Sequence, residues 1–283
     1  MQIITSKEAL TLALKNRANI GFVPTMGNLH AGHIHLVNLA KQHADFIVVS
    51  IFVNPLQFAA NEDLANYPRT LEADCDKLKV AGVDIVFVPS VTELYPDFDG
   101  KNLNQTVMVM PSSVADRLCG ATRPGHFAGV ATVLAKLFNI IQPQVAVFGK
   151  KDFQQLFIIK EMVKQLHYPI QIVAAEIVRE PNGLAMSSRN GYLSETARTS
   201  AHLLSQTLQE IVNAIKDGNV DFGNLENQAA QQLTTQGWIV DYISICAADS
   251  LMPATLNDKN LVLLAAAKID STRLIDNIEF CAK

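Results

Sequence analysis

The chain has 283 residues, 49% of them hydrophobic and 18% charged, which is enough for one large domain or two unequal ones with a substantial buried core. Acidic residues outnumber basic ones by 27 to 23 and no segment concentrates Lys and Arg, which excludes nucleic acid as a partner because polyanion binding needs a basic surface. The longest apolar runs, 47–53 and 261–267, are far shorter than the roughly 18 residues of a membrane span, so no membrane partner is expected.

The N-terminal segment 1–8 has no basic stretch followed by an apolar one, as a secretory signal would have. Four cysteines are dispersed along the chain without a Cys-x-x-Cys pair, at Cys75, Cys119, Cys246 and Cys281. Both features predict a cytoplasmic protein with reduced thiols.

A turn with two glycines and two histidines, residues 24–33, follows the apolar run 20–23 and precedes a helical pattern. Such a turn can bring backbone N–H groups close to a phosphate at the positive end of the helix, and a neutral imidazole can donate to a phosphate oxygen. His30 and His33 lie three residues apart, so the segment predicts a nucleotide site. Two other interpretations remain open, a βα turn with incidental histidines and a zinc site on His30, His33 and His35.

Apolar, β-branched runs alternate with helical patterns between residues 20 and 175. This alternation predicts an α/β fold with a doubly wound parallel sheet, whose ligands lie beyond the carboxyl ends of the strands. The predicted strands are 20–23, 46–53, 83–88, 145–148 and 170–174, and the predicted helices include 33–42, 71–81 and 152–166, the last with Asp152 as its N-cap.

The pattern changes after the turn signal at 181–183. Helices are predicted at 195–217 and 222–236, followed by strands at 238–246 and 261–267. We therefore expect a domain boundary near residue 176, with a first domain of residues 1–176 and a smaller α+β domain of residues 177–283.

Two further segments combine phosphate-binding groups. Lys151 precedes a predicted helix, where its ammonium can neutralise a triphosphate, while Asp152 or Gln155 can bind a ribose or a substrate hydroxyl. The alternative is a capped surface helix with solvated lysines. In segment 183–190 a glycine precedes two hydroxyls and an arginine, Ser187, Ser188 and Arg189, which can hold phosphate oxygens and can equally cap a helix.

Other polar groups are weaker signals. Gln57 offers a donor and an acceptor suited to a small hydroxy acid, and Arg123 or His126 can help to hold an anion, although loop packing explains each of them equally well. Among Glu72, Asp74 and Asp76, one or two can bind Mg²⁺, or all can lie on a solvated helix face. P-loop, Gly-x-Gly-x-x-Gly and Gly-x-Ser-x-Gly motifs are absent from the sequence, so phosphate binding falls to the histidine turn.

Seven segments closely resemble, in the same order, the motifs of the pantothenate synthetase (pantoate–β-alanine ligase) family of histidine-motif nucleotidyltransferases. They are PTMGNLHAGH at 24–33, VSIFVNPLQF at 49–58, YPRT at 67–70, RPGHFAGV at 123–130, KDFQQ at 151–155, MSSRN at 186–190 and TRLIDN at 272–277. The resemblance implies that pantoate attacks the α-phosphate of ATP, that pyrophosphate leaves, and that β-alanine then displaces AMP from pantoyl adenylate. It also implies a Rossmann-like first domain, a C-terminal lid domain and a homodimer.

The resemblance also implies residue roles. His30 and His33 would contact the ATP phosphates, Lys151 with Ser187, Ser188 and Arg189 would form a phosphate clamp, and Asp74 would bind Mg²⁺. The adenosine would be held by Gly149, Asp152 and Val178, with Met26 and Met186 also at the ATP site, and pantoate by Met26, Gln57 and Gln155, with Arg123 and His126 beside them. The zinc interpretation loses its support, because His35 would point away from the other two histidines.

Two positions depart from the family pattern, Lys150, where many members have Glu, and Ala73, where some have a second aspartate before Asp74. Adenylation needs no protein nucleophile, since the substrate carboxylate attacks, and the residues above supply hydrogen-bond donors and positive charge instead. The alternatives are another small-molecule nucleotidyltransferase and a catalytically silent nucleotide-binding regulator.

Overall fold

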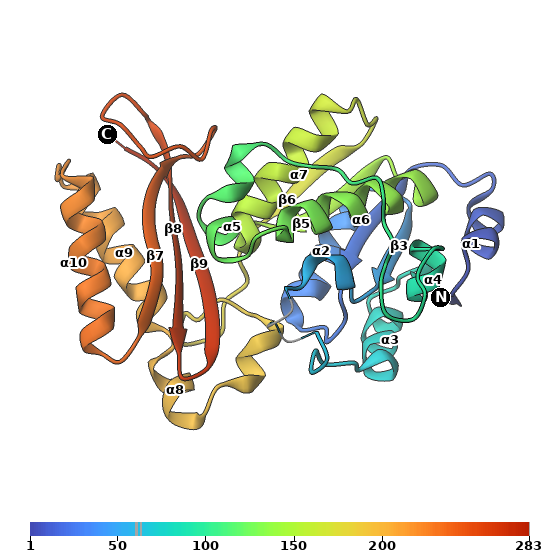
Figure 1. Cartoon of the computed structure of the whole chain (residues 1–283), viewed down its shortest axis with the longest axis horizontal. Helices are drawn as coiled ribbons and strands as arrows, with labels where there is room; N and C mark the ends of the chain where they lie inside the picture. Colours follow the sequence, from blue (N-terminus) through green and yellow to red (C-terminus); the bar gives the residue numbers. More distant parts are fainter. Residues whose placement is uncertain (60–61, 63, 283) are drawn as a thin grey trace. The chain divides into compact units, whose positions relative to one another are not determined.

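The computed structural model describes residues 1–59, 62 and 64–282. The chain forms two compact units (Figure 1), the first comprising Met1–Gly149 and Gln155–Glu176, and the second comprising Lys150–Gln154 and the chain from Ile177 onward. The second unit takes up the chain again at Ile177. The short segment Lys150–Gln154, however, belongs to the second unit, which the sequence pattern did not indicate.

The first unit contains a parallel sheet of six strands with helices, which confirms the predicted α/β class. Its strand order is β1-β4-β3-β2-β5-β6, and every neighbouring pair is parallel. The strands are β1 (Gln2–Ile4), β2 (Ile20–Thr25), β3 (Phe46–Ile51), β4 (Ile85–Phe87), β5 (Val145–Gly149) and β6 (Gln171–Ala175), of which only β1 was not predicted.

The helices of this unit follow the strands as a doubly wound fold requires. They are α1 (Lys7–Leu14), α2 (Ala31–His43), α3 (Leu71–Val80), α4 (Val91–Leu94), α5 (Cys119–Thr122), α6 (His126–Ile141) and α7 (Phe153–Gln165), with 3₁₀ turns η1 (Pro55–Gln57) and η2 (Ser113–Asp116). The 3₁₀ turn η3 (Lys150–Asp152) and the first two residues of α7 belong to the second unit. The sequence did not predict α6, because this helix is apolar on nearly all sides and lacks the polar face that marks a surface helix.

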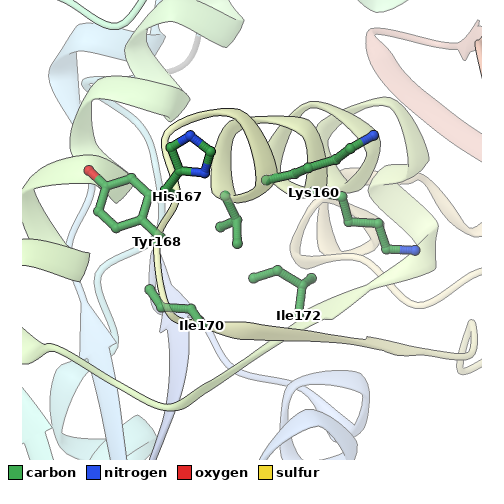
Figure 2. A pocket seen from close by; sticks show the side chains of 7 residues that line it. Lys160, His167, Tyr168, Ile170 and Ile172 are labelled. Carbon is green, nitrogen blue, oxygen red and sulfur yellow. The ribbon is translucent and has the colours of Figure 1, made fainter.

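The sheet edge at β6 borders a shallow pocket of about 470 Å³ (Figure 2), beside the C-terminal turns of α7. Its lining is mixed, with Lys160, Lys164 and His167 beside Val163, Tyr168, Ile170 and Ile172. None of the residues predicted to bind ATP or pantoate lines this pocket.

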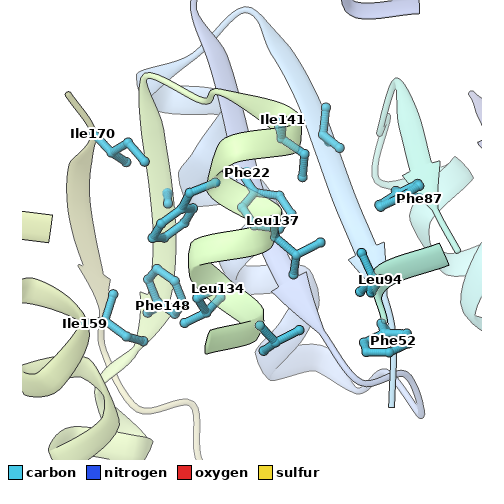
Figure 3. Close-up of a cluster of buried hydrophobic side chains, with 14 of the residues drawn as sticks. Phe22, Phe52, Phe87, Leu94, Leu134, Leu137, Ile141, Phe148, Ile159 and Ile170 are labelled. Atoms are coloured by element: carbon cyan, nitrogen blue, oxygen red, sulfur yellow. The ribbon is translucent and has the colours of Figure 1, made fainter. Parts of the chain in front are cut away.

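Alternate residues of the central strands enter two separate hydrophobic clusters. Phe22 and Phe148 belong to one cluster, with side chains of α1, α6 and α7 (Figure 3), whereas Val23 and Val147 belong to the other, with side chains of α2 and α3. Because successive strand side chains point to opposite faces, helices cover both faces of this sheet. Burying each phenylalanine contributes roughly 1.5–3 kcal/mol.

The order of the strands places a switch point between β2 and β5. From β2 the chain proceeds to β3 and β4 on one side and returns to β5 and β6 on the other. Ligands of such sheets bind outside the carboxyl ends of the strands at this point. Helix α2 follows β2 there, and a Cβ at Gly149, the last residue of β5, would lie 3.9 Å from Leu36 of α2.

The second unit is the expected α+β structure. Its antiparallel sheet has the order β7-β8-β9, with β7 (Ile239–Ala247), β8 (Asn260–Ile269) and β9 (Thr272–Cys281). Its helical segments are η4 (Ser188–Tyr192), α8 (Glu195–Ser200), α9 (Leu203–Lys216) and α10 (Phe222–Thr235), so the helix predicted at 195–217 is divided in two. Apolar side chains of α9 and α10 pack on the sheet.

Strand β9 was not predicted, because two polar residues, Asp276 and Asn277, occupy buried positions within it. Among the described residues, no helix has an apolar stretch long enough to cross a bilayer.

Candidate active site

The histidine turn leaves β2 through two residues in the left-handed region, Gly27 at φ 85° and Asn28 at φ 50°. Both residue types tolerate this conformation better than branched ones. A Cβ at Gly27 would also lie 3.2 Å from Oδ2 of Asp74 and 3.2 Å from Cγ2 of Ile51. Glycine therefore lets the chain reverse direction against the end of β3 and continue into α2.

The two histidines cap α2 reciprocally. Nδ1 of His30, the N-cap residue, accepts from the backbone N–H of Gly32 at 3.1 Å, and Nδ1 of His33 accepts from the backbone N–H of His30 at 3.2 Å. The ring centroids are 4.1 Å apart. A neutral imidazole that accepts at Nδ1 carries its proton on Nε2, so the backbone sets both rings as Nε2–H donors at the positive end of the helix.

Asp74 of α3 holds the same turn from the other side. Its Oδ2 accepts from the N–H of Asn28 at 2.8 Å and from the hydroxyl of Thr70 at 3.0 Å, and its Oδ1 accepts from the N–H of Leu29 at 2.8 Å. Lys77 of the same helix donates to the carbonyl of Leu29 at 2.7 Å. Asp74 and Lys77, one turn apart on α3, therefore bind two N–H groups and one carbonyl of the histidine turn.

This environment does not fit the predicted role of Asp74 as a Mg²⁺ ligand. The side chain of Asp74 is 0% exposed, and both of its oxygens already accept hydrogen bonds, whereas a Mg²⁺ ligand in such a site usually faces water and phosphate. Glu72 and Asp76 are exposed, as is His35. Within the part of the chain that the structure describes, no three His, Cys, Asp or Glu side chains are grouped to hold a metal ion.

Met26, directly after β2, and Gln57, in η1, are both predicted to bind pantoate, and they lie together. The Gln57 amide Nε2 donates to Sδ of Met26 at 3.2 Å, and its Oε1 accepts from Nδ2 of Asn54 at 3.1 Å. Asn54 is 1% exposed, and its Oδ1 accepts from the hydroxyl of Tyr95 at 2.6 Å. This chain of hydrogen bonds sets which way the Gln57 amide faces.

The role of Asn54 was not predicted from the sequence, although an Asn before Pro is a typical N-cap, and here it caps η1. Asn54 also donates to the carbonyl of Gly129 at 3.1 Å. A Cβ at Gly129 would collide with the carbonyl oxygen of Leu56 and would lie 2.7 Å from Cα of Gln57. Glycine at this position of α6 thus permits the close approach that seats η1 and Gln57 against the helix.

Arg123 and His126 support this loop through their own partners. Arg123 forms a two-point ion pair with Glu62, with N–O distances of 2.6 and 2.8 Å, and lies 2.9 Å from Nε2 of His126. Nδ1 of His126 is 2.9 Å from the carbonyl oxygen of Gln57. Burial raises the pKa of Glu62, but the hydrogen bond and the charge of Arg123 outweigh it, so the net pKa is lowered and the pair stays charged.

Two other predicted residues of the first unit lie near the switch point. Gly149 ends β5, and Gln155 lies half-buried in the first turn of α7.

The second unit contains the predicted phosphate clamp, Lys151 with Ser187–Arg189. Residues 178–186 form a short hairpin in which the N–H of Met186 donates to the carbonyl of Val178 at 2.9 Å, so the predicted Val178 and Met186 lie side by side. Ser187 caps η4 by accepting from the N–H of Arg189 at 3.2 Å. Lys151 is 3.8 Å from the half-exposed carboxylate of Asp152.

The buried Asn190 joins the two strands of this hairpin. Its Nδ2 donates to Oε1 of Glu180 at 2.8 Å and to the carbonyl of Ala185 at 3.1 Å. The clamp residues Ser187–Arg189 are therefore carried on a hairpin that is tied together just before and just after them.

Comparison with known proteins places the whole chain in one family. The model of the family described as Pantoate-beta-alanine ligase matches residues 2–279. The pantothenate synthetase of Methylobacillus flagellatus is 59% identical over 99% of both chains, and that of Thiobacillus denitrificans is 55% identical over 99% of this chain and 97% of the relative.

Solved structures agree. The pantothenate synthetase of Thermus thermophilus matches with a TM-score of 0.92 at 39% identity, covering 98% of this chain and 99% of that one. The Francisella tularensis pantoate-β-alanine ligase complexed with Beta-gamma ATP and Beta-alanine matches with a TM-score of 0.77 at 33% identity, covering 98% and 97%. The chain therefore belongs to the pantoate–β-alanine ligase family and is a ligase that forms a carbon–nitrogen bond.

Proposed function

We propose that this enzyme condenses pantoate with β-alanine in two steps at the expense of ATP. In the first step the pantoate carboxylate attacks the α-phosphate, forming pantoyl adenylate and releasing pyrophosphate. In the second step the amine of β-alanine attacks the acyl carbon, and AMP leaves with the former carboxylate oxygen. Membership of the family supports this reaction, as does the Francisella relative complexed with Beta-gamma ATP and Beta-alanine.

The observation that carries the proposal is the reciprocal cap of His30 and His33. Each Nδ1 accepts a backbone N–H, which leaves each ring an Nε2–H donor beside the N-terminus of α2. Charge that develops on the phosphate oxygens during adenylation is stabilised best by donors that are already oriented. We assign the two histidines to the ATP phosphates, with His33 as a catalytic residue.

The substrate carboxylate is the nucleophile, so the protein has to position and neutralise rather than react. Lys151 and Ser187–Arg189 are assigned to the phosphates as the clamp, and Gly149, Asp152, Val178 and Met186 to the rest of ATP. Met26, Gln57 and Gln155 are assigned to pantoate. The Gln57 amide has its Oε1 committed to Asn54, so its NH₂ group faces the Met26 side and can donate to a pantoate oxygen.

Arg123 and His126 are assigned an indirect role in pantoate binding. The charge of Arg123 is balanced by Glu62, and His126 contacts the carbonyl of Gln57, so both set the position of Gln57.

Mg²⁺ is proposed to accompany the triphosphate of ATP. It would neutralise phosphate charge there, and the hydrogen bonds on Asp74 make this residue a support of the histidine turn instead of a metal ligand.

We further propose that residues 1–176 bind ATP and pantoate, that the chain from residue 177 is a lid, and that the enzyme is a cytoplasmic homodimer. Sedimentation velocity tests the dimer.

Exchange of labelled pyrophosphate into ATP tests the reaction. We expect exchange that requires pantoate and proceeds without β-alanine, because pyrophosphate leaves in the first step. Exchange that requires β-alanine would rule out the adenylate mechanism. Exchange that proceeds without pantoate but with another cosubstrate would indicate a different nucleotidyltransferase.

A further inference from the structure

We propose that Asp276 and Asn277 of β9 are positioning residues for the two segments of the phosphate clamp, residues 150–152 and 186–189. This inference rests on the proposed function, because it takes Lys151 and Arg189 as ligands of ATP. All of the residues that carry it belong to the second unit.

Asn277 holds the segment that carries Lys151. Its Nδ2 donates to the carbonyl of Lys150 at 2.9 Å and to the carbonyl of Lys151 at 3.0 Å, although 126 and more residues separate them in sequence. The residue is 3% exposed. Both protons of one amide are thus used on two successive carbonyls, which fixes the orientation of the η3 backbone and with it the direction in which the Lys151 side chain leaves.

The neighbouring Lys150 also contacts β9, but through its side chain. Its Nζ lies 2.7 Å from Oε2 of Glu279, two residues beyond Asn277. The ammonium of Lys150 is therefore bound to the protein's own strand. Strand β9 holds the backbone carbonyls of both lysines, and of their two side chains it is that of Lys151 that is assigned to phosphate.

Asp276 holds the other clamp segment through Arg179. Its carboxylate forms a two-point ion pair with Arg179, at 2.6 and 2.9 Å, and is 4% exposed. Arg179 also donates to the carbonyl of Gly183 at 3.0 Å, and it is bridged to Ala185, the residue before Met186. The hairpin that ends at the clamp is thereby tied to the same strand.

Two buried polar residues in succession are unusual in a strand. Successive side chains point to opposite faces of the sheet, so one of the two occupies a position on the face that packs against the apolar core. Here each one satisfies a different segment. The pair sets the spacing between Lys151 and Ser187–Arg189, and a displacement of about 1 Å in such a group lowers a rate by roughly 10²-fold. The TRLIDN motif is thus explained without direct contact between its side chains and ATP.

Pyrophosphate exchange in a double-mutant cycle tests the role of Asn277. Asn277→Ala is expected to lower kcat of pantoate-dependent exchange by about 10- to 100-fold and to leave the KM for pantoate unchanged. In a Lys151→Ala background the same substitution should lower the rate by less than about twofold, because its effect passes through Lys151. Asn260→Ala, at an exposed polar residue opposite Cys281 at the C-terminal end of β9, is the matched control and should exchange like the wild type.

Asn277→Ser is the second variant, because it keeps a hydroxyl donor but is too short to reach both carbonyls. Thermal unfolding identifies the variants that are folded at the assay temperature, and only those enter the cycle. A second cycle pairs Asp276→Asn with Arg189→Ala. Asp276→Asn should lower kcat of exchange in the wild-type background and have little further effect in the Arg189→Ala background. The inference would be overturned if the rate loss of the double variant equalled the product of the losses caused by Asn277→Ala and Lys151→Ala alone. An unchanged rate in both Asn277 variants would also overturn it. Failure of the wild type to exchange with pantoate would instead overturn the proposed function.

Discussion

The carboxylate of Asp74 accepts the backbone N–H of Leu29 at 2.8 Å, a contact that joins residues 45 positions apart in the sequence. It connects the first turns of α3 to the turn that orients His30 and His33. Asp74, which the family resemblance marks as a metal ligand, thus shapes the backbone of the histidine turn.

Asp74→Asn should test this role. The substitution replaces one acceptor oxygen by a donor that faces a backbone N–H, so we expect a loss of about 1–3 kcal/mol in the free energy of unfolding and a slower adenylation step. Urea unfolding and pyrophosphate exchange measure the two effects. The dependence of the remaining exchange on Mg²⁺ concentration should match that of the wild type. Restoration of the rate by excess Mg²⁺ would show that Asp74 is a metal ligand after all.

His33→Ala should lower the adenylation rate by about 10² to 10³, the range for the loss of one oriented donor in a transition state. His33→Asn is the matched variant, because its side chain can still accept the His30 N–H but has no group at the position of Nε2. We expect it to be slow and nearly as stable as the wild type. Single-turnover formation of pantoyl adenylate is the measurement, and a near-normal rate in either variant contradicts the assignment.

The two lysines at 150 and 151 should differ sharply. Lys151→Ala is expected to lower adenylation by about 10² to 10³. Lys150→Ala removes only a partly exposed ion pair with Glu279, which is worth about 0–1 kcal/mol, so its rate should stay close to that of the wild type. Parallel exchange assays compare them. Equal losses in both variants would mean that the side chains share the phosphate.

Tyr95→Phe should weaken pantoate binding without touching ATP. Burial raises the pKa of Tyr95, so its hydroxyl stays protonated and donates to Asn54 at 2.6 Å. Loss of this donor costs about 1–2 kcal/mol and frees the Asn54 amide to turn, which disturbs Gln57. We expect the KM for pantoate to rise roughly 10-fold with the KM for ATP unchanged. A rise in both constants would point to general unfolding of the site instead.

Glu226→Gln should stabilise the protein to a degree that depends on pH. Burial raises the pKa of Glu226, although the hydrogen bond from the N–H of Ile245, at 2.6 Å, works in the opposite direction. The protonated form is therefore favoured by folding, and its contribution is present below the ordinary pKa of the group and lost as the pH rises through the raised value. Gln mimics the protonated acid. The variant should therefore have a higher melting temperature than the wild type at about pH 8 and the same melting temperature at about pH 4. A lower melting temperature at the higher pH would contradict this.

Local features were readable from the sequence. The strands β2, β3 and β5 are largely apolar runs, and such runs indicate strands that are buried on both faces. The histidine turn was predicted from a short stretch of glycine, histidine and helix-forming residues. Helix α6 and strand β9 were not predicted, because a helix buried all round has no polar face and because Asp276 and Asn277 interrupt the apolar pattern of β9.

The sequence by itself determined which residue types lie in the histidine turn and in the other turns assigned to the substrates, because each of these turns is set by neighbours within a few positions. Only the tertiary structure decided what several polar groups do. Asp74 is occupied by backbone N–H groups, Arg123 is neutralised by Glu62, and Lys150 is paired with Glu279, all through partners far away in the chain. A charged side chain is available to a substrate only if no nearer partner in the fold already binds it, and that competition is settled by packing.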